Sequence, residues 1–184
     1  MKAFINPGHC PGVDPGAIGQ NGLTEADVVK NVGAKTKYYL EAAGVEVEIM
    51  QDDSLEKVCS AANASGADLF ISMHCNAAAN PQANGTEIFT SYGETNADQL
   101  ASCIMKQFND TFPDIYVRGD YSDGDVDKEA GFYVLKNTNM PAVLFEIAFI
   151  TNSFEEEFLG NELNQNEIAK AIARGVTDYL TLSK

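Results

Sequence analysis

Two histidines and two glutamates occupy unusual positions in this 184-residue chain. His9 and His74 are its only histidines, and each lies just past the C-terminal end of a predicted strand. Glu25 stands three, four and seven positions before a valine, so its carboxylate projects from the apolar face of a predicted helix. Glu146 is the only charged residue in the apolar run 141–150. Carboxylates in such places are rare without a partner.

These four residues together predict a zinc centre. A catalytic zinc ion takes three protein ligands and keeps a fourth position for water, and two imidazoles with one carboxylate suit it. His9, Glu25 and His74 supply that set. Glu146 has no Arg or Lys available between positions 136 and 170, and an unpaired buried carboxylate costs several kcal/mol. Beside a zinc-bound water, whose pKa the metal lowers to about 7, such a carboxylate acts as a general base.

Alternating strands and helices must position these residues. Hydrophobic periodicity predicts strands at 2–6, 45–50, 67–73, 85–91, 131–136 and 141–150. It predicts helices at 24–43, 54–64, 95–109 and 164–181, the first with a capping box from Thr24 and Asp27 and a stop at Gly44. This alternation favours an α/β fold, and we expect residues 1–184 to form a single domain with a mixed twisted sheet of about six strands flanked by helices.

The later connections are too short for a uniformly parallel sheet. Only a few residues separate the segment around His74 from 85–91, and few separate 131–136 from 141–150, whereas a parallel crossover needs a dozen or more. We expect those strands to run antiparallel or to be non-adjacent. Ligands of open α/β sheets bind beyond the carboxyl ends of strands, where both histidines fall if strands 2–6 and 67–73 are parallel neighbours.

Two irregular segments surround the predicted site. Residues 6–19, NPGHCPGVDPGAIG, concentrate glycine and proline around His9 and lead into the helix of Glu25. We expect this backbone to hold both side chains in one geometry and to keep bulk away from the metal. The long irregular stretch 111–130 is expected to be a surface loop that contributes to function.

Composition excludes several classes of partner. The net charge of −15, from 27 acidic and 12 basic residues, would repel phosphate backbones, so no nucleic acid is expected. No apolar run is long enough to span a bilayer, so no membrane association is expected. The residues before Pro7 are too few for the apolar core of a signal peptide, and we therefore predict none and leave the export route open.

Four ordered segments resemble the zinc-dependent N-acetylmuramoyl-L-alanine amidases of the type 3 family, which cleave bacterial peptidoglycan. The segments are 5–25 (INPGHCPGVDPGAIGQNGLTE), 61–77 (AANASGADLFISMHCNA), 85–90 (GTEIFT) and 131–152 (GFYVLKNTNMPAVLFEIAFITN). Cys10, Pro11 and Cys75 depart from the small residues usual in the family, which leaves the ligands in place. The autoinhibitory helix that some relatives insert has no counterpart here, and we expect an open site.

The resemblance implies a mixed-sheet α/β fold of the zinc amidase, phosphorylase/hydrolase-like type. It makes His9, Glu25 and His74 the ligands of one zinc ion and Glu146 the catalytic acid/base. The reaction it implies is hydrolysis of the amide between the lactyl group of N-acetylmuramic acid and L-alanine. Such an enzyme acts on the cell wall, outside the cell or in the periplasm, as an autolysin or endolysin. A wall-binding module or an activator could lie outside this chain.

Asn76 and Arg118 are the predicted substrate contacts. Arg118 lies in an otherwise acidic stretch, 118–131, that leads toward the strand of Glu146, and its guanidinium suits a stem-peptide carboxylate. Asn76 could orient His74 or bind substrate, although an asparagine after a strand is also ordinary turn chemistry.

Two other functions remain open from the sequence. One is a cysteine hydrolase in which Cys10 or Cys75 is the nucleophile and a histidine is the base. His74 and Cys75 cannot form that pair with each other, because neighbours on a strand point to opposite faces. The other is a non-catalytic zinc-containing wall-binding module, against which the presence of Glu146 argues.

Overall fold

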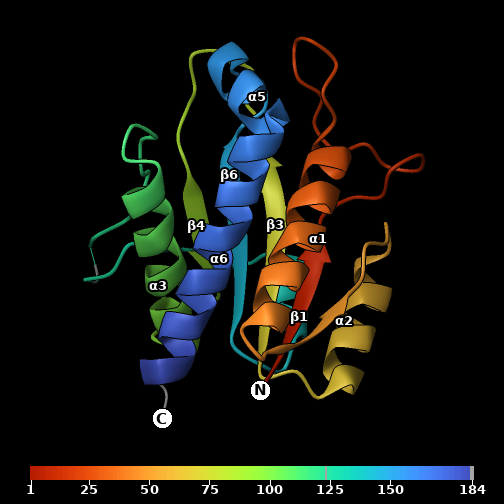
Figure 1. The fold of residues 1–184 in the computed structure, drawn as a ribbon, viewed down its shortest axis with the longest axis vertical. Helices are drawn as coiled ribbons and strands as arrows, with labels where there is room; N and C mark the ends of the chain where they lie inside the picture. Colours follow the sequence, from red (N-terminus) through yellow and green to blue (C-terminus); the bar gives the residue numbers. More distant parts are fainter. Residues whose placement is uncertain (123, 183–184) are drawn as a thin grey trace.

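A six-stranded sheet with the strand order β2-β1-β3-β6-β4-β5 organises the chain in the computed structural model, which describes residues 1–122 and 124–182 (Figure 1). The strands are β1 (Lys2–Pro7), β2 (Glu46–Ile49), β3 (Leu69–Asn76), β4 (Glu87–Thr90), β5 (Lys128–Glu129) and β6 (Ala142–Phe149). The helices are α1 (Glu25–Ala42), α2 (Leu55–Ser65), α3 (Asn96–Thr111), α4 (Tyr133–Asn137), α5 (Ser153–Gly160) and α6 (Glu162–Leu182). The predicted α/β fold is confirmed.

The sheet is mixed, as the short connections indicated. β1 runs parallel to β2 and β3, β3 runs parallel to β6, and β4 pairs antiparallel with β6 and parallel with β5. β3 and β4 follow each other in sequence but are not neighbours, because β6 lies between them. The parallel pairing of β1 with β3 brings the carboxyl ends of both strands to one edge.

Apolar side chains cover both faces of the sheet. On one face α1, α3 and α6 lie side by side, in front of the strands in Figure 1, and enclose the larger core, which includes Ile71 and Phe145. On the other face α2 and α4 pack over a smaller core around Phe70 and Leu144. No helix within residues 1–122 and 124–182 has the length and hydropathy needed to cross a bilayer.

Helix α1 begins as the sequence predicts. The Thr24 hydroxyl accepts a hydrogen bond from the Asp27 amide, which satisfies one of the free N–H groups of the first turn. The valines at 28, 29 and 32 are fully buried against the sheet. Glu25 in the first turn is only 3% exposed, so its carboxylate lies inside the protein, as its helical position predicted.

The prediction of a strand at 131–136 is wrong. This segment forms the short helix α4, and the neighbours Val134 and Leu135 are both buried against the smaller core. A strand would point two consecutive side chains to opposite faces, whereas a helical turn packs both onto the sheet. The edge strand is instead β5 at Lys128–Glu129.

One strand boundary and one additional helix also differ from the prediction. β3 continues to Asn76, so His74 lies within the strand rather than beyond its end. Helix α5 was not predicted, and it begins where the Asn152 side chain accepts hydrogen bonds from the Phe154 and Glu155 amides. The described residues between α3 and β5, 112–122 and 124–127, are irregular as expected, and they join the sheet where the Thr86 amide donates to Tyr116 O and the Arg118 amide donates to Thr86 O.

Candidate metal centre

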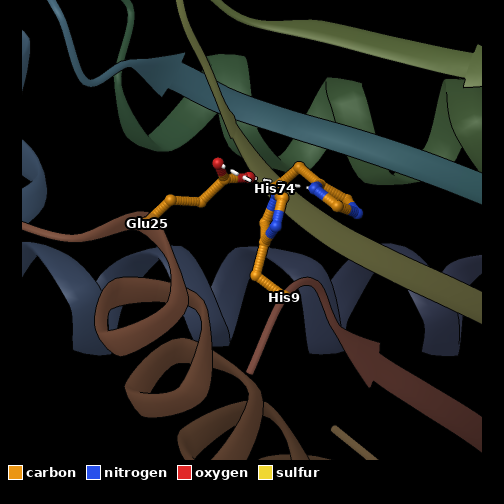
Figure 2. A group of neighbouring side chains, drawn as sticks. All are labelled: His9, Glu25 and His74. Carbon is orange, nitrogen blue, oxygen red and sulfur yellow. Dashed lines mark hydrogen bonds and ion pairs between the residues drawn. The ribbon is translucent and has the colours of Figure 1, made fainter. Parts of the chain in front are cut away.

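The side chains of His9, Glu25 and His74 converge at the carboxyl edge of the sheet (Figure 2). Each offers one nitrogen or oxygen atom, and these atoms lie within 4.8 Å of one another. His9 Nε2 is 3.2 Å from Glu25 Oε2, and His74 Nδ1 is 2.9 Å from Glu25 Oε1. The two imidazole rings meet edge to face, with centroids 5.2 Å apart. Three potential metal ligands from the loop after β1, the start of α1 and the end of β3 therefore share one place.

His9 is held in an unusual backbone conformation. Its φ of +58° is the only positive value among the non-glycine residues that the structure describes. The Nδ1 atom of its ring lies 2.7 Å from Asp14 Oδ2, and the other Asp14 oxygen accepts from the Gly16 amide at 3.0 Å. A carboxylate on one ring nitrogen fixes the orientation of an imidazole and leaves the other nitrogen for a metal. Here that nitrogen, Nε2, faces Glu25.

Two glycines leave room for these ligands. A Cβ atom on Gly8 would lie 2.2 Å from Cε1 of His74. A Cβ atom on Gly16 would lie 2.6 Å from both Glu25 Oε2 and His9 Cδ2, and Gly16 also has a φ of +66°. The predicted role of the glycine-rich segment is thus visible as space in which no side chain fits.

Hydrogen bonds from all sides fix the Glu25 carboxylate. Besides the two imidazoles, the Ala17 amide donates to Oε2 at 2.9 Å and the Cys75 amide donates to Oε1 at 3.0 Å. Burial alone would raise the pKa of Glu25, but the hydrogen bonds from His74 and His9 outweigh it and hold this pKa well below its usual range. The same contact with Glu25 raises the pKa of His9 to about 9. A bound cation therefore has to compete with a proton for the His9 ring nitrogen that faces Glu25.

Glu146 lies beside this group without a partner of its own. On the adjacent strand it is in register with His74, so both side chains project from the same face of the sheet. Its Oε2 atom is buried and has no hydrogen-bond partner among the described residues. Burial raises the pKa of Glu146 to about 7, the range in which a carboxylate can both accept and release protons at neutral pH.

The two predicted substrate contacts meet at a residue that the sequence analysis missed, Glu87. The side-chain Nδ2 of Asn76 donates to Glu87 Oε2 at 2.6 Å, and Arg118 Nε donates to Glu87 Oε1 at 2.7 Å. Lys128 Nζ donates to the same Oε1 at 2.7 Å. Asn76 thus orients Glu87, and no hydrogen bond joins it to His74 in the described structure. Asp14 was also missed, although an aspartate five positions after a candidate histidine ligand is a signal for an orienting carboxylate.

The cysteines do not form a nucleophilic site. Cys75 is buried, and burial raises the pKa of its thiol well above the ordinary value. Within the described residues all four cysteines are free thiols, and neither Cys10 nor Cys75 forms a hydrogen bond from its sulfur to a histidine. A reactive cysteine needs a thiolate stabilised by a nearby base or cation, so the geometry argues against a cysteine hydrolase.

Comparison with known proteins decides the family. The family model for N-acetylmuramoyl-L-alanine amidase matches residues 3–178. This chain belongs to the N-acetylmuramoyl-L-alanine amidase family. The resemblance found in the four sequence segments is thereby confirmed, and the chain is a peptidoglycan amidase domain rather than a cysteine hydrolase.

Individual relatives match this chain over nearly its whole length. It is 37% identical to the uncharacterized protein YqiI of Bacillus subtilis over 96% of its length and 83% of that protein. It is 35% identical to the N-acetylmuramoyl-L-alanine amidase LytC of the same organism, but spans only 35% of LytC. The solved structure of the amidase AmiC2 of Nostoc punctiforme superposes with a TM-score of 0.89 at 31% identity, covering 98% of this chain and 97% of that one.

Proposed function

We propose that residues 1–184 form one catalytic domain that hydrolyses the amide between the lactyl group of N-acetylmuramic acid and L-alanine. His9, Glu25 and His74 hold a single zinc ion, and Glu146 is the catalytic acid/base. The observation that carries this proposal is the convergence of three potential ligands beside a buried carboxylate oxygen that has no partner.

The donor set fits zinc. Two imidazole nitrogens and one carboxylate oxygen are ligands that catalytic zinc sites use, and a three-residue set leaves a position for water. Asp14 supplies the carboxylate that such sites place behind a histidine ligand. Glu25 is ionised because its pKa is held low, so it can bind a cation without first losing a proton.

Bound zinc supplies a Lewis acid that polarises the scissile carbonyl and makes water acidic enough to lose a proton near neutral pH. Glu146 accepts that proton as the water attacks the carbonyl carbon. It then donates the proton to the nitrogen of the departing L-alanine amine, so that the carboxylate returns to its starting state. The raised pKa of Glu146, caused by burial, suits a group that must both take and give a proton.

The substrate contacts are proposed on the same face of the sheet. Arg118 binds a carboxylate of the stem peptide, and Asn76 contacts substrate or supports the residues that do. Both side chains are partly exposed and both contact Glu87, the cross-strand neighbour of Glu146. This neighbourhood supports the proposal that they bind substrate beside Glu146.

The site of action is the bacterial cell wall, outside the cell or in the periplasm. An acidic chain of net charge −15 does not adhere by charge to anionic wall polymers. We therefore propose that a wall-binding module or an activator outside these 184 residues brings the domain to its substrate. The protein can serve as an autolysin or as a phage-type endolysin, since both need the same reaction.

Replacement of the proposed base tests the function. Glu146→Gln keeps the shape of the side chain but removes its basicity, so the release of L-alanine amino termini from purified cell walls should fall by about 10²–10⁴-fold. Zinc content by elemental analysis should remain one ion per chain. Glu56→Gln, at an exposed position on α2, is the matched control and should retain activity.

Three results would contradict the proposal. The first is undiminished amine release by Glu146→Gln. The second is wild-type protein that holds no zinc after incubation with the metal and removal of the excess. The third is activity that survives chelation of the metal but is lost on thiol alkylation.

A further inference from the structure

We propose that Arg118 and Lys128, held by Glu87, form a carboxylate-binding subsite for the second residue of the stem peptide. This inference rests on the proposed amidase function and deepens it. It adds Lys128 as a binding residue and gives Glu87 the role of a positioning residue, which acts through the two cations. Its ligand is a free carboxylate, such as the α-carboxylate of an isoglutamate that follows L-alanine.

Glu87 is the centre of the cluster. Its side chain is buried, and Arg118 Nε and Lys128 Nζ each donate to Oε1 at 2.7 Å. The side-chain Nδ2 of Asn76 donates to Oε2 at 2.6 Å, so both carboxylate oxygens of Glu87 accept hydrogen bonds. These contacts lower the pKa of Glu87 although burial alone would raise it, and the group stays ionised at neutral pH. One carboxylate facing two cations leaves the three side chains with one positive charge.

Both cations keep donors that no protein atom uses. Arg118 is also held by a contact from Nη1 to Asn84 O at 3.3 Å and by the Phe149 ring below its guanidinium, 5.1 Å from ring centroid to Cζ. In the described structure Arg118 Nη2 has no acceptor, and Lys128 Nζ, which also lies 6.0 Å from the centroid of the Phe89 ring, donates a hydrogen bond only to Glu87 Oε1. The side chains are 37% and 31% exposed. A ligand carboxylate can therefore reach an Arg fork and an ammonium that are already fixed in place.

The nearby buried carboxylate of Glu155 does not occupy these donors. Its two oxygens accept hydrogen bonds from the Gly85 and Phe149 amides, each at 2.7 Å. Both donors are backbone amides, and no hydrogen bond joins Glu155 to Arg118 in the described structure. The free face of Arg118 is thus left for a ligand.

The position of the cluster matches the second stem residue. His74, Glu146 and Glu87 are in register on the neighbouring strands β3, β6 and β4, so their side chains form one row. Two strand spacings of about 4.8 Å place Glu87 roughly 10 Å from His74 and one spacing from Glu146. An extended peptide advances about 3.4 Å per residue, so an α-carboxylate on the second residue beyond the scissile amide lies roughly 7 Å from it. This distance falls between the one strand spacing that separates Glu87 from Glu146 and the two that separate it from His74.

A pair of soluble substrates tests the subsite. Muramyl-L-alanyl-D-isoglutamate carries a free α-carboxylate on its second residue, and muramyl-L-alanyl-D-isoglutamine carries a neutral amide at that position, while both keep the γ-carboxylate. With zinc-loaded protein, kcat/KM from amine release should favour the acid by about tenfold or more, as charge-assisted hydrogen bonds do. Arg118→Gln and Lys128→Gln should each reduce this preference to less than about threefold. Arg118→Lys keeps the charge without the fork and should retain part of the preference.

The ratio of the two kcat/KM values separates binding from structure. If Arg118 and Lys128 only held the loop to the sheet, their removal would lower both kcat/KM values alike and leave the ratio unchanged. Lys57→Gln is the matched control, because it removes one positive charge from Lys57 on α2, which pairs with Asp52 before that helix, and it should keep the wild-type ratio.

The possible results have distinct meanings. Loss of the preference in the two glutamine variants alone supports the subsite. Equal hydrolysis of acid and amide by wild-type protein, or variants that keep the ratio, would overturn it. Digestion of cell walls without hydrolysis of either dipeptide would also overturn it, because a subsite for the second residue makes a dipeptide sufficient. Failure to release amines from any substrate, walls included, would instead overturn the proposed function.

Discussion

Gly16 and Gly12 offer a matched pair of substitutions that tests how the loop after β1 holds the proposed metal ligands. Both glycines have a positive φ, +66° for Gly16 and +82° for Gly12. Alanine at either position should therefore destabilise the fold by about 1–2 kcal/mol through the left-handed backbone alone. A Cβ atom at position 12 meets nothing within 4 Å, whereas at position 16 it meets Glu25 Oε2 and His9 Cδ2 at 2.6 Å.

The difference between the two variants measures the displacement of the ligands. Ordinary contact needs at least 3.4 Å, so the His9 ring and the Glu25 carboxylate must each move by several tenths of an ångström in Gly16→Ala. Metal–ligand distances tolerate only about ±0.2 Å. We expect Gly16→Ala to lose about 100-fold or more in zinc affinity, while Gly12→Ala stays within about threefold of wild type.

Competition with a chromophoric chelator gives the zinc affinity, and thermal unfolding of the metal-free protein gives the stability. We expect Gly16→Ala and Gly12→Ala to have similar unfolding temperatures and very different zinc dissociation constants. Equal zinc affinity in Gly16→Ala and Gly12→Ala would refute it.

Two further predictions concern pH. In the Glu146→Gln background, zinc affinity should rise about tenfold per pH unit from pH 6 to 8. The reason is that Glu25 raises the pKa of His9 to about 9, so the metal must displace a proton from the His9 ring. A zinc affinity that does not change with pH in chelator competition would contradict this. Burial raises the pKa of Asp127 to about 7, so wild-type stability should fall as pH rises from 4 through 7. In denaturant titrations at pH 8, the free energy of unfolding of Asp127→Asn should exceed that of the wild type by about 2 kcal/mol. At pH 4 the two free energies should be equal.

The candidate site could be predicted because its residues break local patterns. Glu25 lies on the apolar face of a helix, and Glu146 is the only charge in a buried run, so each signals a chemical role without knowledge of the fold. The two histidines became a pair only through the parallel pairing of β1 with β3, which the alternation of strands and helices indicated. Local violations of patterning are where function is expected.

Other parts of the fold depend on contacts that no short segment encodes. The residues of α4 include Tyr133 and Val134, which favour strands, yet the apolar surface of the sheet selects a helical turn. Glu87 reads as an ordinary polar position in a strand. Its cationic partners, Arg118 and Lys128, lie 31 and 41 positions away and beyond helix α3, so only the folded chain shows the cluster.

Anomalous diffraction at the zinc absorption edge, from crystals of protein loaded with one equivalent of zinc, shows directly whether these residues hold the metal. We expect a single strong peak bonded to His9, Glu25 and His74, with the Glu146 carboxylate next to the remaining coordination position. A peak elsewhere in the molecule, or none between the two imidazoles, would contradict it.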